Sequence, residues 1–249
     1  MNINSFNSTA SHHENDEGPG AIYLSEYLLG LNDGAGFLTN LTMEEQSSIR
    51  SLSSKINVKK GQGLFFQGDA HTGVWIIEKG RIRSYYTGPS GREITLAYWT
   101  AGHFVGGPEV FGGGRHIWSG DAMDDGELLF LSGVNMRKLV QDVPNVALGV
   151  IDGLVAKGKC YSALIQMLGT RSIAERLEQL LVILADTHGH QSGQTISIER
   201  TITYEQIASI VGATRQWVTL SLIKLQKRGV LKISRKEIVI YDIEKLSVY

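Results

Sequence analysis

The sequence has 249 residues, of which 42% are hydrophobic and 20% are charged, and its formal net charge at pH 7 is −1. This composition is typical of a globular protein, the length allows two domains, and no apolar run is long enough to cross a bilayer. The single cysteine, Cys160, excludes an intrachain disulfide and any metal site built from several cysteines of one chain. We therefore expect a cytoplasmic protein with no membrane association and no metal site, and the first twenty residues have no signal-peptide core.

Residues 1–36 are predicted to form an N-terminal extension that is partly disordered, because its first half is polar. Short amphipathic helices are predicted over 22–31 and 41–53. Thr42 and Glu45 have the spacing of a capping box, in which each side chain bonds the backbone N–H group of the other residue. Ile49 and Leu52 are expected to supply the apolar contacts of this second helix.

Short apolar runs separated by glycines extend from about residue 56 to residue 132. A hairpin turn is predicted at 86–91, and the predicted strands are 64–66, 74–77, 82–86, 94–99 and 128–131. Many short strands with glycine turns are typical of an antiparallel barrel or sandwich. An enzyme with a cupin-like barrel is the rival interpretation. Its metal site would need paired histidines and a carboxylate, and this segment contains no His-x-His pattern.

Residues 144–168 are predicted to form one long helix, with Pro144 in its first turn. Its apolar residues alternate four and three positions apart over three heptads, which indicates a parallel helix pair between two subunits. A helix with one face buried in its own domain would show a similar pattern. The predicted dimer interface consists of Ala147, Ile151, Leu154, Gly158, Tyr161, Ile165 and Leu168. An amphipathic helix over 173–186 and a loop over 188–193 are predicted to follow.

The segment 203–231 has the pattern of two helices joined by a tight turn. Thr203 and Gln206 form a second capping box, Gly212 stands at the turn, and Thr214 can cap the next helix. This next helix has one apolar stripe, which consists of Val218, Leu222 and Leu225. The polar residues near its start lie off that stripe, where a helix-turn-helix presents side chains to DNA bases.

A β-hairpin is predicted over 230–240, with its turn at 234–236, and it completes a winged helix. From Glu199 onwards the chain has nine Lys and Arg residues against five Asp and Glu residues, a local balance of +4. A basic module on a near-neutral protein is typical of phosphate binding. Two alternatives leave this charge unexplained. One is an ordinary helical hairpin in a larger core, and the other is a protein that only associates through its long helix.

In this order and spacing, the motifs resemble those of the Crp/Fnr family of bacterial transcription regulators, over roughly residues 37–243. In the strand-rich part the resemblance rests on Lys60-Gly61, Gln67-Gly68-Asp69, Gly80-Arg81-Ile82, Gly91-Arg92-Glu93 and Gly102-His103-Phe104-Val105-Gly106. In the C-terminal part it rests on residues 203–208 and 212–218. The resemblance implies an α+β fold with a cyclic-nucleotide-binding-like antiparallel β-roll at 37–142, a long dimerisation helix at 143–168 and a winged helix-turn-helix at 169–249.

The resemblance also implies a small effector that binds the β-roll beside the long helix. Cyclic-nucleotide members of the family have a Glu shortly after Phe-x-Gly and an Arg-Ser or Arg-Thr pair further on, but this chain has Gly107 and Ile117-Trp118 there. Cyclic AMP is therefore not expected, because its phosphate would lose a bidentate guanidinium partner. The predicted pocket residues are Tyr98, Trp99, Phe104, Gly106, Gly107, Glu109, Arg115, Trp118, Gly158 and Tyr161.

Two alternatives to such an effector stay open, and the sequence identifies no cofactor. The first is haem-type gas sensing, for which His71, His103 or His116 could offer an imidazole. The second is regulation without any ligand, as in some family members.

The partners implied by the resemblance are double-stranded DNA with an inverted-repeat operator, a second copy of the chain, and RNA polymerase if the protein is an activator. Arg215 is expected to read a guanine and Gln216 an adenine. Leu220 stands where many relatives have a second Arg. The predicted DNA-binding residues are Thr203, Thr214, Arg215, Gln216, Trp217, Thr219, Lys224 and Lys236. No catalytic residue is predicted.

Overall fold

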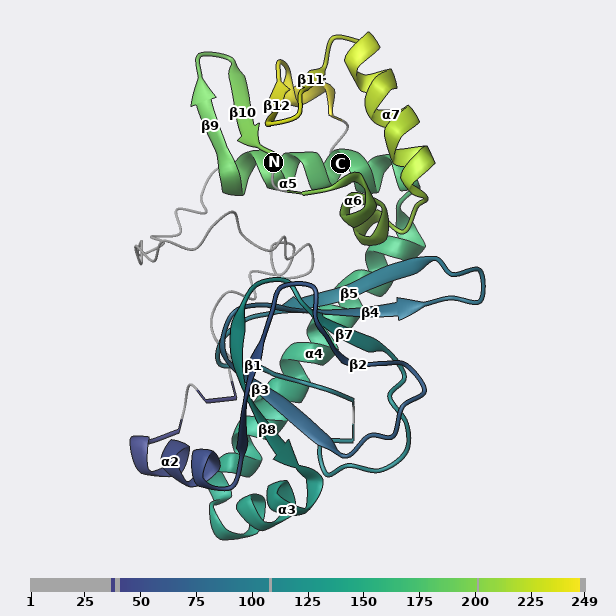
Figure 1. Cartoon of the computed structure of the whole chain (residues 1–249). Coiled ribbons are helices and arrows are strands. Elements are labelled where there is room, and N and C mark those ends of the chain that lie inside the picture. The colour runs from purple at the N-terminus through teal and green to yellow at the C-terminus, as the bar shows by residue number, and fades with distance from the viewer. Residues whose placement is uncertain (1–36, 39–40, 108, 201, 247–249) are drawn as a thin grey trace, which may run out of the picture.

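A computed structural model describes residues 37–38, 41–107, 109–200 and 202–246 of the chain. Figure 1 shows two folded units joined by one long helix, with a β-roll at the lower end and a helical unit with a small sheet at the upper end. The predicted order of strands, long helix and winged helix is confirmed, and so is the α+β fold. The N-terminal extension and the helix predicted over 22–31 lie outside the described residues. Within the described ranges, no helix combines the length and the hydropathy that a membrane span requires.

The β-roll consists of two four-stranded antiparallel sheets, with the strand orders β1-β8-β3-β6 and β2-β7-β4-β5. Its strands are β1 (Ser54–Val58), β2 (Gly63–Phe65), β3 (Gly73–Lys79), β4 (Ile82–Thr87), β5 (Glu93–Trp99), β6 (Phe104–Val105), β7 (Ser119–Ala122) and β8 (Gly126–Ser132). Phe65, Ile77 and Leu128 belong to the apolar core of the roll. They reach it because successive side chains of a strand point to opposite faces.

All five predicted strands are present, but β1, β6 and β7 were not predicted. Strand β6 has only two residues, and β7 has the sequence Ser-Gly-Asp-Ala, which contains no β-branched or aromatic residue. Strand β1 is largely exposed. These strands exist because longer neighbours pair with them, which is information that a local pattern does not contain.

Two short helices, α2 (Met43–Ser51) and α3 (Gly133–Asp142), lie at the lower end of the β-roll (Figure 1). The capping box predicted for α2 is confirmed. Thr42 Oγ1 accepts a hydrogen bond from the N–H of Glu45 at 3.3 Å, and the Glu45 carboxylate accepts one from the N–H of Thr42 at 2.8 Å. Helix α3 was not predicted, although the hydroxyl of Ser132 caps its first turn.

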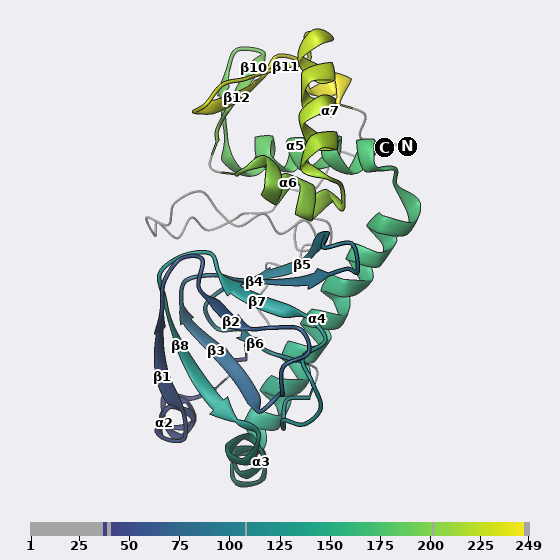
Figure 2. The ribbon, with the colours of Figure 1, turned by 45° about the vertical axis from the view of Figure 1, so that its right-hand side comes forward.

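Helix α4 (Pro144–Thr170) runs along the β-roll and reaches the second unit (Figure 2). Pro144 lies in its first turn, as predicted. One face packs against its own chain, and the buried residues are Val146, Gly149, Val150, Gly153, Lys157, Cys160, Ala163 and Met167. Gly153 permits a close approach, because a Cβ atom there would lie 2.5 Å from the ring of Phe104.

A different face of α4 is apolar and exposed. Its large apolar side chains are between 36% and 69% exposed, and they are Leu148, Ile151, Leu154, Val155 and Ile165. Four predicted interface residues, Ile151, Leu154, Gly158 and Ile165, are therefore exposed. The alternative that these residues are buried in their own domain is wrong.

The other three predicted interface residues are partly covered by their own chain. Ala147 is half-buried. The ring of Tyr161 lies against Trp118, with 5.6 Å between the ring centroids. Leu168 packs against the core of the second unit. These residues can add less area to a subunit interface than the heptad pattern predicts.

The second unit consists of three helices and a sheet with the strand order β11-β12-β10-β9. The helices are α5 (Ile173–His188), α6 (Tyr204–Val211) and α7 (Arg215–Lys227), and the strands are β9 (Gly189–Ser192), β10 (Thr195–Glu199), β11 (Leu231–Ile233) and β12 (Glu237–Ile240). A 3₁₀ turn follows at Ile243–Lys245. The predicted hairpin after the second helix is the pair β11 and β12, which forms the wing.

The loop predicted over 188–193 is wrong. His188 ends α5, and Gly189–Ser192 forms the edge strand β9, which pairs antiparallel with β10. Gly193 follows β9 at the hairpin turn, with φ 63°. The strand consists of Gly, His, Gln and Ser, so it lacks the apolar alternation by which a strand is predicted.

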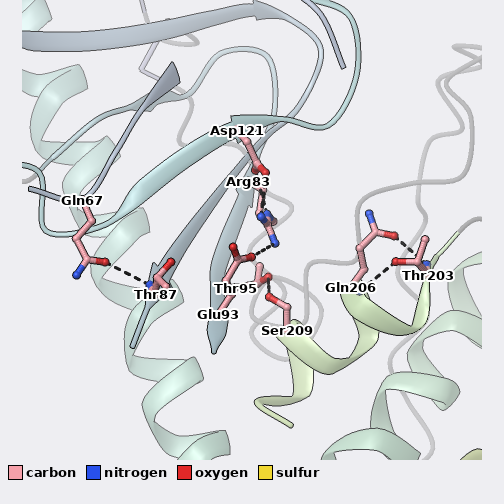
Figure 3. A network of polar contacts seen from close by, with 9 residues as sticks. All are labelled: Gln67, Arg83, Thr87, Glu93, Thr95, Asp121, Thr203, Gln206 and Ser209. Carbon is pink, nitrogen blue, oxygen red and sulfur yellow. Dashed lines mark hydrogen bonds and ion pairs between the residues drawn. The ribbon is translucent and has the colours of Figure 1, made fainter. Parts of the chain in front are cut away.

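The two units meet where α6 packs on β5 (Figure 2). The hydroxyl groups of Thr95 and Ser209 are 2.7 Å apart in a buried hydrogen bond (Figure 3). Tyr98 also crosses the boundary, since it is buried in the core of the second unit. Its neighbour Trp99 is buried in the core of the β-roll, because successive residues of a strand face opposite ways.

Candidate DNA interface and effector site

The helix-turn-helix is held by local hydrogen bonds between its side chains and its backbone N–H groups. Thr203 Oγ1 accepts from the N–H of Gln206 at 3.2 Å, and Gln206 Oε1 accepts from the N–H of Thr203 at 2.8 Å (Figure 3). Gly212 ends α6 in the left-handed region with φ 69°, which only glycine adopts at low cost. Thr214 Oγ1 accepts from the N–H of Trp217 at 3.2 Å. The predicted capping box, turn and second cap are confirmed.

The first turn of α7 presents polar side chains to solvent. Arg215 and Gln216 are exposed. The guanidinium of Arg215 lies 3.9 Å from the carboxylate of Glu205, and 70% of the Arg215 side chain is exposed. An exposed ion pair of this kind contributes little energy, so it leaves Arg215 available to another partner.

The other predicted DNA-binding residues differ in exposure. Thr203, Lys224 and Lys236 are exposed, and Lys236 lies at the tip of the wing. Thr219 is half-buried and donates from Oγ1 to the backbone oxygen of Arg215 at 2.9 Å. Trp217 is half-buried against the core of the second unit. The structure therefore brings a polar turn and two lysines to the surface, whereas Trp217 has a packing role.

A cleft of about 830 Å³ separates the β4–β5 hairpin from the first turns of α6 and α7. Residues of both units line it, among them Arg92, Thr203 and Arg215. Arg83, also in its wall, donates to the carboxylate of Asp121 at 2.9 and 3.0 Å and lies 3.1 Å from that of Glu93 (Figure 3). The first turn of α7 is thus close to the β-roll in this arrangement.

The junction between the β-roll and α4 contains a buried lysine among aromatic rings. The ammonium nitrogen of Lys157 donates to the backbone oxygen of Phe104 at 2.7 Å. The same nitrogen lies 3.7 Å from the ring centroid of Trp99 and 4.7 Å from that of Phe104. Burial lowers the pKa of Lys157 to about 7. The pKa of the nearby His103 is also lowered, mainly by burial and secondarily by the charge of Lys157.

Trp118 and Tyr161 extend this aromatic cluster. Trp118 donates from Nε1 to the backbone oxygen of Gly106 at 2.7 Å. The ring centroid of Tyr161 lies 5.6 Å from that of Trp118 and 6.5 Å from that of Trp99. Burial raises the pKa of the Tyr161 phenol, so the phenol is neutral at pH 7.

Two buried histidines lie behind Gly107. His71 Nε2 accepts a hydrogen bond from the N–H of Gly107 at 2.7 Å, which assigns the proton of neutral His71 to Nδ1. The rings of His71 and His116 are 4.5 Å apart, and His116 stacks on Phe65. Burial, followed by the charge of His71, lowers the pKa of His116 to about 4. Neither Nδ1 atom has a hydrogen-bond partner in the part of the chain that the structure describes.

Gly107 is required by this contact, because a Cβ atom there would lie 2.4 Å from the ring of His71. A glutamate at residue 107, the type expected for a cyclic-nucleotide site, would displace that ring. The backbone of this segment is therefore built around His71 and leaves no room for the acidic residue.

Comparison with known proteins identifies the family. A family model of the cyclic nucleotide-binding domain matches residues 55–143, and a model of the Crp-like helix-turn-helix domain matches residues 175–249. The chain belongs to the Crp/Fnr family of transcriptional regulators.

The Crp/Fnr relatives match most of the chain. A CRP-like cAMP-activated global transcriptional regulator of Mycobacterium tuberculosis is 23% identical over 206 residues, which cover 82% of this chain and 92% of the relative. The global nitrogen regulator of Synechococcus elongatus is 27% identical over 191 residues, which cover 76% of this chain and 86% of the relative. The structure of the c-di-GMP-responsive global regulator CLP of Xanthomonas campestris has a TM-score of 0.71 at 20% identity, covering 80% of this chain and 99% of that one. At this identity the structural likeness concerns the fold alone.

The predicted effector pocket of this Crp/Fnr protein is only partly assembled. Trp99, Phe104, Gly106, Trp118 and Tyr161 lie together at the junction with α4, and Gly107 lies behind them against His71. This grouping is the part of the prediction that the geometry brings together.

Three predicted pocket residues lie elsewhere, and a fourth, Glu109, is exposed beside Gly107. The prediction that Tyr98 shares a pocket with Trp99 is wrong, because Tyr98 faces the second unit. Arg115 is exposed and donates to the backbone oxygen of Gly68 at 2.6 Å. Glu109 is exposed as well, but its carboxylate lies beside Gly107, because a Cβ atom at residue 107 would lie 3.2 Å from Glu109 Oε2. Gly158 is exposed on α4, and a Cβ atom built on it would meet nothing within 4 Å.

Lys157 was missed by sequence reasoning. It lies on the buried face of α4, three residues before Cys160 and four after Gly153. A helical wheel drawn from Val146 to Met167 would have placed this lysine within the buried stripe. The heptad pattern predicts a subunit interface on the neighbouring face and assigns no role to Lys157.

Replacing Lys157 with methionine is expected to stabilise the protein most at low pH. The ordinary pKa of a lysine is 10.5 and that of folded Lys157 is about 7. Between pH 7 and pH 10.5 the unfolded chain binds a proton that the folded chain does not, so the free energy of unfolding rises with pH in this range. The destabilising effect of the lysine is therefore complete below pH 7 and fades as the pH rises towards 10.5. We expect Lys157→Met to raise the free energy of unfolding by about 1–3 kcal/mol at pH 6, with a smaller gain at pH 9.

Urea unfolding at pH 6, 7.5 and 9 and at constant protein concentration measures this effect. Lys159→Met is the matched control, because Lys159 is exposed on the same helix. A gain for Lys157→Met that is equal at all three pH values would contradict the assignment of a titrating buried amine.

Proposed function

We propose that this Crp/Fnr regulator acts in the cytoplasm as a homodimer that binds an inverted-repeat DNA operator through α7, under the control of a small effector. The observation that supports it most is the exposed polar first turn of α7, with Arg215 and Gln216 beside a capped helix start. Arginine can bond O6 and N7 of guanine, and glutamine N6 and N7 of adenine. RNA polymerase would be a further partner of an activator. Because the relatives are transcriptional regulators, we propose no enzymatic activity.

The apolar exposed face of α4 supports the homodimer. Ile151, Leu154 and Ile165 are exposed there along one side of a helix of 27 residues. An apolar stripe of this length on a surface is typical of a protein interface. In a dimer formed by two α4 helices, a twofold axis would relate the two α7 helices. An operator for such a dimer is an inverted repeat with half-sites about one helical turn apart.

Selection from a pool of randomised duplexes tests the DNA-binding proposal. We expect wild-type protein to enrich an inverted repeat with two half-sites of that spacing, and a mobility shift to reproduce the binding. A bound pool with the same sequence composition as the input pool would contradict the proposal.

The cluster around Lys157 supports an effector site between the β-roll and α4. Trp99 and Phe104 offer apolar faces, and none of the described carboxylates forms an ion pair with Lys157. Aromatic walls with a few placed polar groups are typical of small-molecule sites. Cyclic AMP is not the proposed effector, because Gly107 lacks the acidic side chain and Arg115 is exposed. Purified protein with a haem absorption band would favour the alternative of haem-type gas sensing.

We propose that the contact between α6 and β5 is the element through which the effector acts. Thr95 and Ser209 share a buried hydrogen bond across it. With the units docked in this way, the β4–β5 hairpin stands next to the first turn of α7, where DNA would have to enter. An effector that binds the undocked arrangement more tightly would shift the population towards DNA binding.

Ser209→Ala is expected to raise the DNA affinity of the effector-free protein by up to about five- to thirtyfold. The substitution leaves the buried hydroxyl of Thr95 without its partner in the docked arrangement only, which costs roughly 1–2 kcal/mol. Fluorescence anisotropy with the selected operator measures the change. Ser47→Ala, at an exposed serine of α2, is the control. An unchanged affinity for Ser209→Ala would show that this contact does not restrain α7.

A further inference from the structure

The exposed face of α7 has an apolar stripe along its centre. Each residue of an α-helix turns by about 100°, so one line of side chains lies directly opposite the buried residues Val218, Leu222 and Leu225. That line consists of Gln216, Leu220, Ile223 and Lys227. Leu220 is 60% exposed and Ile223 is 43% exposed. Large apolar side chains therefore occupy the middle of the face that would enter a groove.

The charges around this stripe identify its partner. Arg215, Lys224 and Lys227 are exposed on the same helix, and the segment from Glu199 onwards has a balance of +4. A helix face with cations around an apolar centre can bind a polyanion that also offers an apolar group. The major groove of DNA offers one such group, the C5-methyl of thymine, whereas its other edge groups are hydrogen-bond donors and acceptors.

We propose that Leu220 is a specificity-determining residue that contacts the C5-methyl group of a thymine in each half-site of the operator. The inference rests on the proposed function, in which α7 enters the major groove. Gln216 lies one helical turn before Leu220, with about 5–6 Å between their Cβ atoms. That spacing corresponds to about two base steps of 3.4 Å. The thymine lies within two base pairs of the base that Gln216 contacts.

Replacing thymidine with deoxyuridine is the direct test, because deoxyuridine pairs in the same way and lacks only the C5-methyl group. The operator selected by wild-type protein is remade with deoxyuridine at each thymidine in turn, at equivalent positions of both half-sites. A buried CH₂ or CH₃ group contributes about 0.8 kcal/mol, which is about fourfold in affinity. We expect one position at which wild-type protein loses about fourfold per half-site.

Variants at residue 220 connect that position to the side chain. Leu220→Ala should bind the thymidine and deoxyuridine operators equally at that position, and Leu220→Met should keep the preference for thymidine. Val134→Ala is the matched control, because Val134 is an apolar residue of α3 that is 77% exposed. It should leave both affinities unchanged.

The outcomes separate the inference from the function on which it rests. If wild-type protein selects an operator but binds every deoxyuridine version as well as the parent, the inference is overturned and DNA binding stands. If Leu220→Ala retains the full preference for thymidine, another residue contacts the methyl group and the assignment to Leu220 is wrong. If wild-type protein enriches no duplex at all, the proposed function fails, and the inference fails with it.

Discussion

Ile165→Glu is expected to convert the protein from a dimer into a monomer. Ile165 is 69% exposed on the apolar face of α4. In a parallel helix pair, two glutamates would face each other near the twofold axis, and each would be buried without a cationic partner. Sedimentation velocity at micromolar concentration should show a single species of monomer mass, and the wild-type protein is expected to sediment as a dimer.

Gln166→Glu is the matched control for this variant. Gln166 is the next residue of α4, is exposed, and points about 100° away from Ile165. The Gln166→Glu substitution introduces the same charge beside the proposed interface rather than within it, so this variant should remain a dimer. If Ile165→Glu sediments as a dimer as well, α4 does not associate through the face that bears Ile165.

Loss of the dimer should also weaken operator binding by on the order of 10²-fold. Two half-sites are then bound by two independent monomers instead of one linked pair, and the gain from effective concentration disappears. Ile165 lies far along the chain from Arg215, so the substitution leaves the contacts of α7 unchanged. If the variant is a monomer but has the operator affinity of wild type, the proposal that the dimer binds both half-sites is wrong.

The helix-turn-helix could be predicted because its determinants are local. The capping box of Thr203 and Gln206 and the left-handed Gly212 need only neighbouring residues. The same holds for the capping box at Thr42. Where structure depends on distant pairing, the prediction failed: the residues of β7 and β9 have weak strand preference and are strands because β4 and β10 bond to them.

The effector site was harder to predict, because it depends on which face of an element covers which unit. Tyr98 and Trp99 are both buried and adjacent, and only the docking of α6 on β5 decides that Tyr98 belongs to the second unit. Lysines are almost always exposed, so the residue type alone does not predict that Lys157 is buried. It is buried because the glycine four residues earlier lets α4 approach Phe104 closely.

Arg215→Ala is expected to weaken operator binding by about 1–3 kcal/mol and to relax the preference at one base pair of each half-site. Arg215 is exposed in the first turn of α7, and its only ion pair, within the chain that the structure describes, is the weak one with Glu205. A bidentate contact to guanine O6 and N7 would be lost, and no other long cationic side chain lies in that turn.

Lys236→Ala is the comparison that separates base reading from phosphate binding. Lys236 lies at the exposed tip of the wing, where the charge can reach a phosphate. This variant should bind all sequences more weakly by a similar factor and lower the salt dependence of binding by about one per contact. It should therefore return the wild-type consensus in a selection from randomised duplexes.

The selection is run with wild type, Arg215→Ala and Lys236→Ala at the same salt concentration. Arg215→Ala should return a consensus in which one guanine per half-site is no longer specified and the other positions keep their information. Arg215 is not a base reader if its alanine variant returns the wild-type consensus at every position. In that case the guanidinium would act as Lys236 does, on the DNA backbone, and the salt dependence of Arg215→Ala would fall in the same way.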